Sequence, residues 1–170
     1  EGLTLEALGE AFVAAPLEAA VGLIVADGAP FPIIRFIMSE EDVQYVLRHP
    51  AVMIGSDGYA MSPALGSKPH PRSYGTFTRV LGEYVRDKKV LSLEEAVRKM
   101  TAFPAARFGL WDRGLIRPGQ VADLVLFDPE RIRDAATFED PHRYSEGVAG
   151  VMVGGQMVWQ DGQDTGAVAG

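Results

Sequence analysis

The segment Val52–Gly58 places a single carboxylate in a setting that suits catalysis. A short apolar run, Val-Met-Ile, leads through Gly55 and Ser56 to Asp57. If this run is a strand of a β/α barrel, Asp57 lies at the strand's C-terminal end, where the active sites of that fold are found. No metal-ligand pattern lies nearby in the sequence, so Asp57 fits a general base whose metal is bound elsewhere. The alternative is an aspartate that opens a loop and accepts backbone hydrogen bonds.

A second polar group follows in a loop rich in Ser, Pro and Gly that runs from Ser56 to about Gly75. Its residues that could do chemistry are His70, Arg72, Ser73, Tyr74 and Thr76. Arginine presents a planar fork that pairs with a carboxylate in a way that lysine cannot imitate. The same arginine could equally be an exposed loop residue, and His70, between two prolines, could be a solvent-facing turn residue.

Composition restricts the class of protein. The 170 residues are 47% hydrophobic and 23% charged, which is typical of a globular domain. The net charge of −7 argues against nucleic-acid binding, and the lack of cysteine excludes disulfides and thiolate metal sites within the chain. We find neither a signal-like start nor an apolar run of the roughly 20 residues that a membrane span needs. We therefore expect a cytoplasmic protein without a membrane partner, and a start at Glu1 that reflects processing or truncation.

The first third of the chain predicts alternating helices and strands. Helical spacing of apolar residues predicts one helix over 8–15 and a second from Pro16 to Asp27. A buried strand over 33–38, a helix that Ser39 caps and Pro50 closes, and a strand over 52–55 would follow. This strand–helix–strand order predicts a parallel βαβ unit. Two strands cannot close a barrel, so the segment fits the end of a larger fold.

The remainder predicts helices and then a small β unit. Apolar spacing predicts a helix over 77–85, and Ser92 with Glu95 forms a capping box for the next helix, which Pro104 breaks. A short turn or helix over 105–110 would follow. A strand over 121–127 and a hairpin around Gly154-Gly155 complete the pattern, with a long loop over 128–147 and a frayed tail from Gln160.

Several of these stretches, in order, resemble the C-terminal portion of the D-aminoacylases, the N-acyl-D-amino-acid deacylases of the amidohydrolase superfamily. The Gly-Ser-Asp-Gly sequence at 55–58 and the His-Pro-Arg-x-x-Gly-Thr-Phe sequence at 70–77 are the most specific. The other matching stretches are 38–43, 49–54, 91–101, 113–119 and 122–128.

The resemblance implies an α/β fold, namely the C-terminal fragment of a metal-dependent (β/α)8 barrel followed by part of a small β domain. Residues 1–112 would be the last β/α units and C-terminal helices of the barrel, 113–162 the β domain, and 163–170 a flexible tail. It also implies zinc as the cofactor. The family's early His-x-His pair and its other metal ligands are missing here, and His49, His70 and His142 stand far apart. The zinc ligands would therefore lie outside this chain.

The resemblance implies a role for Asp57, and the chemistry of the neighbouring side chains indicates candidate roles for them. Asp57 would act on the metal-bound water and return its proton to the leaving nitrogen, while Arg72 would hold the substrate's carboxylate. His70 would line the same pocket or orient Arg72, and Ser73, Tyr74 and Thr76 would donate hydrogen bonds to the acyl group. The substrate would be a small N-acyl-D-amino acid, with the isolated chain inactive.

Two alternatives stay open at the level of sequence. The chain could be a non-catalytic module that self-associates, or that pairs with a missing N-terminal part, because an open sheet edge and an uncovered apolar face favour association. The same scaffold could also open a cyclic amide, since a fold alone does not fix the reaction.

Overall fold

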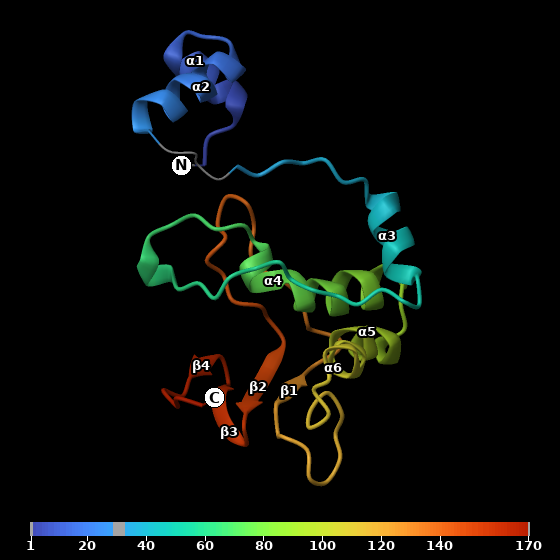
Figure 1. Ribbon diagram of the computed structural model, residues 1–170. Helices are drawn as coiled ribbons and strands as arrows, with labels where there is room; N and C mark the ends of the chain where they lie inside the picture. The colour runs from blue at the N-terminus through green and yellow to red at the C-terminus, as the bar shows by residue number, and fades with distance from the viewer. Residues whose placement is uncertain (1, 29–32, 170) are drawn as a thin grey trace. The chain divides into compact units, whose positions relative to one another are not determined.

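The computed structural model describes residues 2–28 and 33–169 (Figure 1). The chain forms two compact units, one up to Ile37 and the other from Met38 onward. In the part that the structure describes, no single helix is long and apolar enough to cross a membrane. The first two helices together meet the length and composition requirement, but they are bent by 78° to one another.

The first unit is a pair of helices, as the sequence predicted. Helix α1, Leu5–Phe12, begins where the hydroxyl of Thr4 accepts a hydrogen bond from the N–H of Ala7 at 3.1 Å. Helix α2, Pro16–Asp27, has its proline in the first turn and ends at Gly28, whose φ of 71° suits glycine. The two helices bury a small apolar core made of Leu8, Ala19 and Ala20, with Ala14 and Leu23 packed against it.

The predicted parallel βαβ unit is not formed. The segments 33–38 and 52–55 are not strands, and neither belongs to the sheet of the second unit. The side chains of Phe36 and Ile37 are 78% and 72% exposed, so the first segment is not the buried strand that we predicted. A parallel strand needs neighbours for its backbone hydrogen bonds, and the described residues supply none in that register. The N–H of Ile54, for example, donates to the carbonyl oxygen of Lys99 instead.

The helix between these segments is present. Helix α3, Glu40–Arg48, is capped by the hydroxyl of Ser39, which accepts from the N–H of Asp42 at 3.1 Å. A single 3₁₀ turn, η1, Pro63–Leu65, lies in the loop that follows.

A long helix crosses the second unit. Helix α4, Arg72–Arg79, continues without a break into η2, Val80–Asp87, a π-helix. The predicted helix over 77–85 therefore begins five residues early, at Arg72, and changes its winding at Val80. Single π turns are frequent at functional sites, and a full π segment is rare.

Two shorter helices follow, α5, Leu93–Met100, and α6, Ala102–Phe108. Ser92 caps α5 as predicted, because its hydroxyl accepts from the N–H of Glu95. Helix α6 starts before Pro104, which is tolerated in a first turn. The core of the unit is an apolar cluster contributed by η2, the connection between η2 and α5, α5 itself and the segment after β1: Val80, Leu81, Tyr84, Val90, Ala96 and Ile132.

The C-terminal part carries a four-stranded antiparallel sheet in the order β1-β2-β3-β4. Its strands are β1, Leu124–Phe127; β2, Val148–Val153; β3, Gln156–Gln160; and β4, Gln163–Asp164. Gly154 and Gly155 form the predicted hairpin turn, both with positive φ. Strand β4 falls where we expected only a frayed tail. The predicted domain boundary between residues 112 and 113 stays a prediction.

Two glycines let the C-terminal segment approach the long helix. A Cβ atom on Gly75 would lie 2.6 Å from Cβ of Asp134, and one on Gly82 would lie 2.6 Å from the carbonyl oxygen of Ile132. Any larger residue would separate the helix from residues 132–134. The segment after β1 is thereby held against the face of α4 and η2.

Candidate active site

A fully buried lysine anchors the segment that carries Asp57. The ammonium group of Lys99 has no solvent exposure and donates to the carbonyl oxygens of His49 at 2.5 Å and Val52 at 3.0 Å. A carboxylate oxygen of Glu95 lies 3.7 Å from the same nitrogen. Because the backbone carbonyl of Lys99 also accepts from the N–H of Ile54, one residue fixes both ends of the turn at 49–54. In this structure residues 52–55 are held by Lys99 and not, as we had predicted, by pairing with a neighbouring strand.

Asp57 itself stands in an unusual backbone conformation. Its φ is 49°, in the left-handed region, where aspartate is one of the few residues tolerated. The next residue must be small, since a Cβ on Gly58 would lie 2.9 Å from the Cα of Ser73. The turn therefore presses directly on the start of helix α4 and directs the carboxylate toward it.

The two residues with the strongest predicted roles meet at this point. The Oδ2 atom of Asp57 lies 2.9 Å from Nη2 of Arg72, the first residue of α4. The side chain of Asp57 is 85% exposed and that of Arg72 is 40% exposed. A carboxylate this open can exchange protons with a bound molecule, and the ion pair uses one terminal nitrogen of a five-donor guanidinium. The arrangement suits proton transfer beside an anion-binding group.

His70 caps the same helix. Its Nδ1 accepts a hydrogen bond from the N–H of Arg72 at 3.0 Å, and its ring meets the ring of Phe138 edge-on, with centroids 5.1 Å apart. Burial lowers the pKa of His70 below its ordinary value, and the positive charge of Arg72 adds to that effect, while Asp57 opposes it. A neutral imidazole is the form that can accept at Nδ1, so the surroundings favour the capping state.

The hydroxyl groups expected to bind the acyl group already have partners. Ser73 accepts from the N–H of Tyr59 at 3.3 Å, and Thr76 donates to the carbonyl oxygen of Arg72 at 2.9 Å. The hydroxyl of Tyr74 bonds to His142 at 2.8 Å. The structure brings Tyr74 and Ser73 next to Arg72 along one helix, but their binding role stays a prediction.

Sequence reasoning missed two residues at this site, Lys99 and His142. A signal for Lys99 exists, because it follows Ala96 by one helical turn on the buried face of α5 and is a charge within an apolar stripe. His142 carries no such local signal, since its two partners, Ser67 and Tyr74, lie far away in the sequence.

The described residues do not form a metal site of their own. They include no group of three or more His, Cys, Asp or Glu side chains that could hold a metal ion. Each histidine ring is also engaged: Nδ1 of His49 accepts from Ala51, Nδ1 of His70 from Arg72, and both nitrogens of His142 are hydrogen-bonded. The donor set of the described residues therefore does not fit a resident zinc ion, and the location of the zinc ligands outside this chain stays a prediction.

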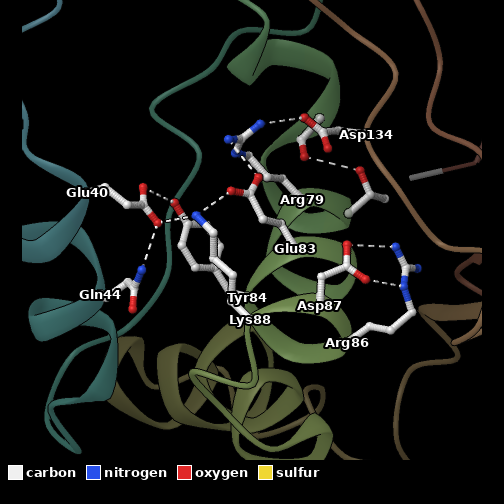
Figure 2. Close-up of polar contacts among 11 residues, drawn as sticks. Glu40, Gln44, Arg79, Glu83, Tyr84, Arg86, Asp87, Lys88 and Asp134 are labelled. Atoms are coloured by element: carbon white, nitrogen blue, oxygen red, sulfur yellow. Dashed lines mark hydrogen bonds and ion pairs between the residues drawn. The ribbon is translucent and has the colours of Figure 1, made fainter.

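A charge network ties α3 to the long helix beside this region (Figure 2). Glu40 accepts from Lys88, from the hydroxyl of Tyr84 at 3.2 Å and from Gln44 at 3.1 Å. Lys88 also pairs with Glu83 at 2.7 Å, and Glu83 with Arg79 at 2.7 Å. The hydrogen bond from Lys88 is the main cause that lowers the pKa of Glu40. The network fixes α3 against η2. Because α3 ends directly before the turn at 49–54, the network also holds the start of the turn that Lys99 anchors.

The fold and the sequence place the chain in a known class. It belongs to the amidohydrolase family, whose model matches residues 4–159. It is 47% identical over 150 residues to an N-acyl-D-aspartate deacylase of Alcaligenes xylosoxydans xylosoxydans, covering 88% of this chain and 28% of that protein. It is 48% identical over 147 residues to a D-aminoacylase of the same organism, covering 86% of this chain and 30% of the relative.

Solved structures of similar proteins support the same family. An N-acyl-D-glutamate deacylase from Bordetella bronchiseptica, complexed with zinc and a phosphonate inhibitor, is 41% identical and superposes with a TM-score of 0.82, over 94% of this chain and 32% of the other. A D-aminoacylase structure, 43% identical, gives 0.82 over 96% of this chain and 32% of the other. The chain thus spans roughly 30% of the length of these relatives.

Proposed function

We propose that this chain is the C-terminal segment of a zinc-dependent hydrolase that cleaves N-acyl-D-amino acids to a carboxylate and a free D-amino acid. The observation that carries the proposal is the solvent-accessible pair of Asp57 and Arg72 at the start of α4, in a chain whose similar proteins are deacylases of this kind. In the intact protein, residues 52–55 would become a strand of a (β/α)8 barrel that delivers Asp57 to the active site.

Asp57 would move the proton that the reaction needs. Amide hydrolysis requires that a water oxygen attacks the carbonyl carbon, that the C–N bond breaks and that the nitrogen leaves as an amine. Asp57 would accept the proton of the attacking water and then give it to the leaving nitrogen, so that the carboxylate is regenerated. Zinc, held by ligands outside this chain, would supply Lewis-acid chemistry.

Arg72 would recognise the substrate's carboxylate. A guanidinium binds a carboxylate through two parallel hydrogen bonds, which fixes orientation as well as charge. Because Asp57 and Arg72 already lie 2.9 Å apart, a substrate held by the arginine would bring its amide close to the base. The intact enzyme would act in the cytoplasm on a small molecule, and this chain without the rest would be inactive.

Turnover by the full-length protein tests the proposal. The zinc-loaded protein would be given N-acetyl-D-aspartate, N-acetyl-D-glutamate and N-acetyl-D-leucine, each beside its L enantiomer, and the free amine would be measured. We expect at least one D substrate to be hydrolysed and its L enantiomer to be left intact. Equal turnover of both enantiomers, or hydrolysis of cyclic amides only, would overturn the proposed substrate class.

A further inference from the structure

A segment from the C-terminal part of the chain lies over the start of helix α4. Residues 138–145, called the strap below, form the end of the long loop between β1 and β2. Its side chains contact the stretch that carries the candidate substrate-binding residues at four positions: Ser67, His70, Tyr74 and Thr78. Three of these positions lie within five residues of Arg72 in sequence, on both sides of it.

His142 makes the central contacts of the strap. Its Nε2 lies 2.5 Å from the carbonyl oxygen of Ser67, and its Nδ1 lies 2.8 Å from the hydroxyl oxygen of Tyr74. A carbonyl oxygen can only accept, so Nε2 carries a hydrogen; in the neutral imidazole Nδ1 then has none and accepts from the tyrosine. Burial, reinforced by the neighbouring Tyr144, raises the pKa of Tyr74, which keeps its hydroxyl protonated and able to donate.

The flanks of the strap extend this hold. Phe138 packs its ring edge-on against His70, the residue that caps α4 at Arg72. At the other end, the hydroxyl of Ser145 donates to the carbonyl oxygen of Tyr74 at 3.2 Å and lies 2.6 Å from the hydroxyl of Thr78. The strap therefore fixes the loop before Arg72 and the helical turn after it at the same time.

We propose that His142 is a positioning residue of the active site: by joining Ser67 to Tyr74 it holds the first turn of α4 in the orientation in which Arg72 receives the substrate's carboxylate. This inference rests on the proposed function. It also assigns Tyr74 a different role from the one predicted from sequence, because the hydroxyl serves the strap and not the acyl group. His142 acts through other residues and does not touch the substrate.

Steady-state kinetics of the full-length protein tests this role. We expect His142→Leu to raise KM for the preferred N-acyl-D-amino acid about tenfold, with kcat within about threefold, because binding and not the proton transfer at Asp57 is disturbed. Tyr74→Phe breaks one of the two hydrogen bonds and should give a smaller rise in KM. The double variant should match His142→Leu, since both changes remove the same interaction. Arg143→Gln, an exposed position in the same strap, is the matched control and should leave KM unchanged.

The outcomes separate the alternatives. Additive effects of His142→Leu and Tyr74→Phe would show that Tyr74 binds the substrate directly, and would overturn the inference, as would an unchanged KM in His142→Leu. If His142→Leu fails to fold, His142→Gln replaces it. The glutamine amide offers both a donor for Ser67 and an oxygen that can accept from Tyr74, so it should raise KM less than Tyr74→Phe does, and a larger rise would overturn the inference.

Hydrogen exchange gives a readout that does not depend on activity. The amides of Ser67, Lys68, His70 and Arg72 should exchange faster in His142→Leu than in the wild type or in Arg143→Gln, while the melting temperatures of all three stay close. Unchanged exchange there would overturn the inference. A wild-type protein that hydrolyses none of the substrates would instead count against the proposed function, and the exchange data would still decide the role of the strap.

Discussion

The carboxylate of Asp57 and the guanidinium of Arg72 form an ion pair at 2.9 Å, although the whole loop of residues 58–71 separates them in sequence. The pair forms because the turn at Gly58 presses against the first turn of α4. Each group is open to solvent, so the pair stabilises the fold little, and exposed ion pairs are commonly worth about 1 kcal/mol or less. Its geometry therefore fits a functional role better than a structural one.

Replacing Arg72 by lysine should impair substrate binding. Lysine keeps the charge but cannot form the two parallel hydrogen bonds to a carboxylate. We expect Arg72→Lys in the full-length protein to raise KM for an N-acyl-D-amino acid by about tenfold or more, at a comparable melting temperature. Arg48→Lys, on the exposed side of α3, serves as the control. A KM that stays at the wild-type value in Arg72→Lys would remove the arginine from the binding site.

Replacing the buried Lys99 should destabilise the turn that leads to Asp57. Methionine fills a similar volume but leaves the carbonyl oxygens of His49 and Val52 without their donor. We expect Lys99→Met to lower the free energy of unfolding by about 2–4 kcal/mol, as urea unfolding would measure. Arg107→Met, at an exposed position of α6, should cost less than about 0.5 kcal/mol. Equal stability of the two variants would mean that Lys99 is not an anchor.

His70 should make the local stability depend on pH in a defined window. Its pKa in the folded chain is below its ordinary value of 6.5, so the unfolded chain binds more protons between these two values. The contribution of His70 to the free energy of unfolding is present above about pH 6.5 and is lost as the pH falls through the lowered pKa. Replacing His70 by glutamine should flatten this part of the curve of unfolding free energy against pH. An identical curve in His70→Gln would show that another group titrates there.

Glu40 should make stability depend on pH in a more acidic window. Lys88, which donates to it, is the first cause of its lowered pKa, and the ordinary value is 4.5. The stabilisation is therefore present above about pH 4.5 and is lost as the pH falls through the lower folded value. Lys88→Met should reduce this loss, while the adjacent exposed Lys89→Met should not. Acid unfolding followed by circular dichroism would measure both, and the same acid midpoint in the two variants would contradict the assignment.

Local signals allowed most helices to be predicted. Ser39 and Ser92 cap helices, and Pro16 and Gly28 bound another, because those interactions lie within a few residues of each other. The hairpin at Gly154-Gly155 follows from the same kind of local constraint. Interactions between residues this close together in sequence can be predicted from the local pattern of residue types.

Features that depend on distant partners could not be predicted in this way. The segments 33–38 and 52–55 have the composition of strands, but a strand forms only when a neighbour shares its hydrogen bonds, and no strand among the described residues pairs with either of them. Asp57 and Arg72 were each predicted to be site residues, but the ion pair between them was not predicted. The bond between Tyr74 and His142 was missed because nothing near His142 in sequence indicates its partner.

Turnover by an Asp57→Asn variant most directly tests whether Asp57 transfers the proton. Asparagine has nearly the same shape, but it cannot carry a proton between the water and the leaving nitrogen. We predict that in the full-length, zinc-loaded protein kcat for an N-acetyl-D-amino acid falls by about 10²–10⁴. The melting temperature should barely change, because the side chain is 85% exposed. A variant that folds, binds substrate and still turns over at close to the wild-type rate would contradict the role of Asp57.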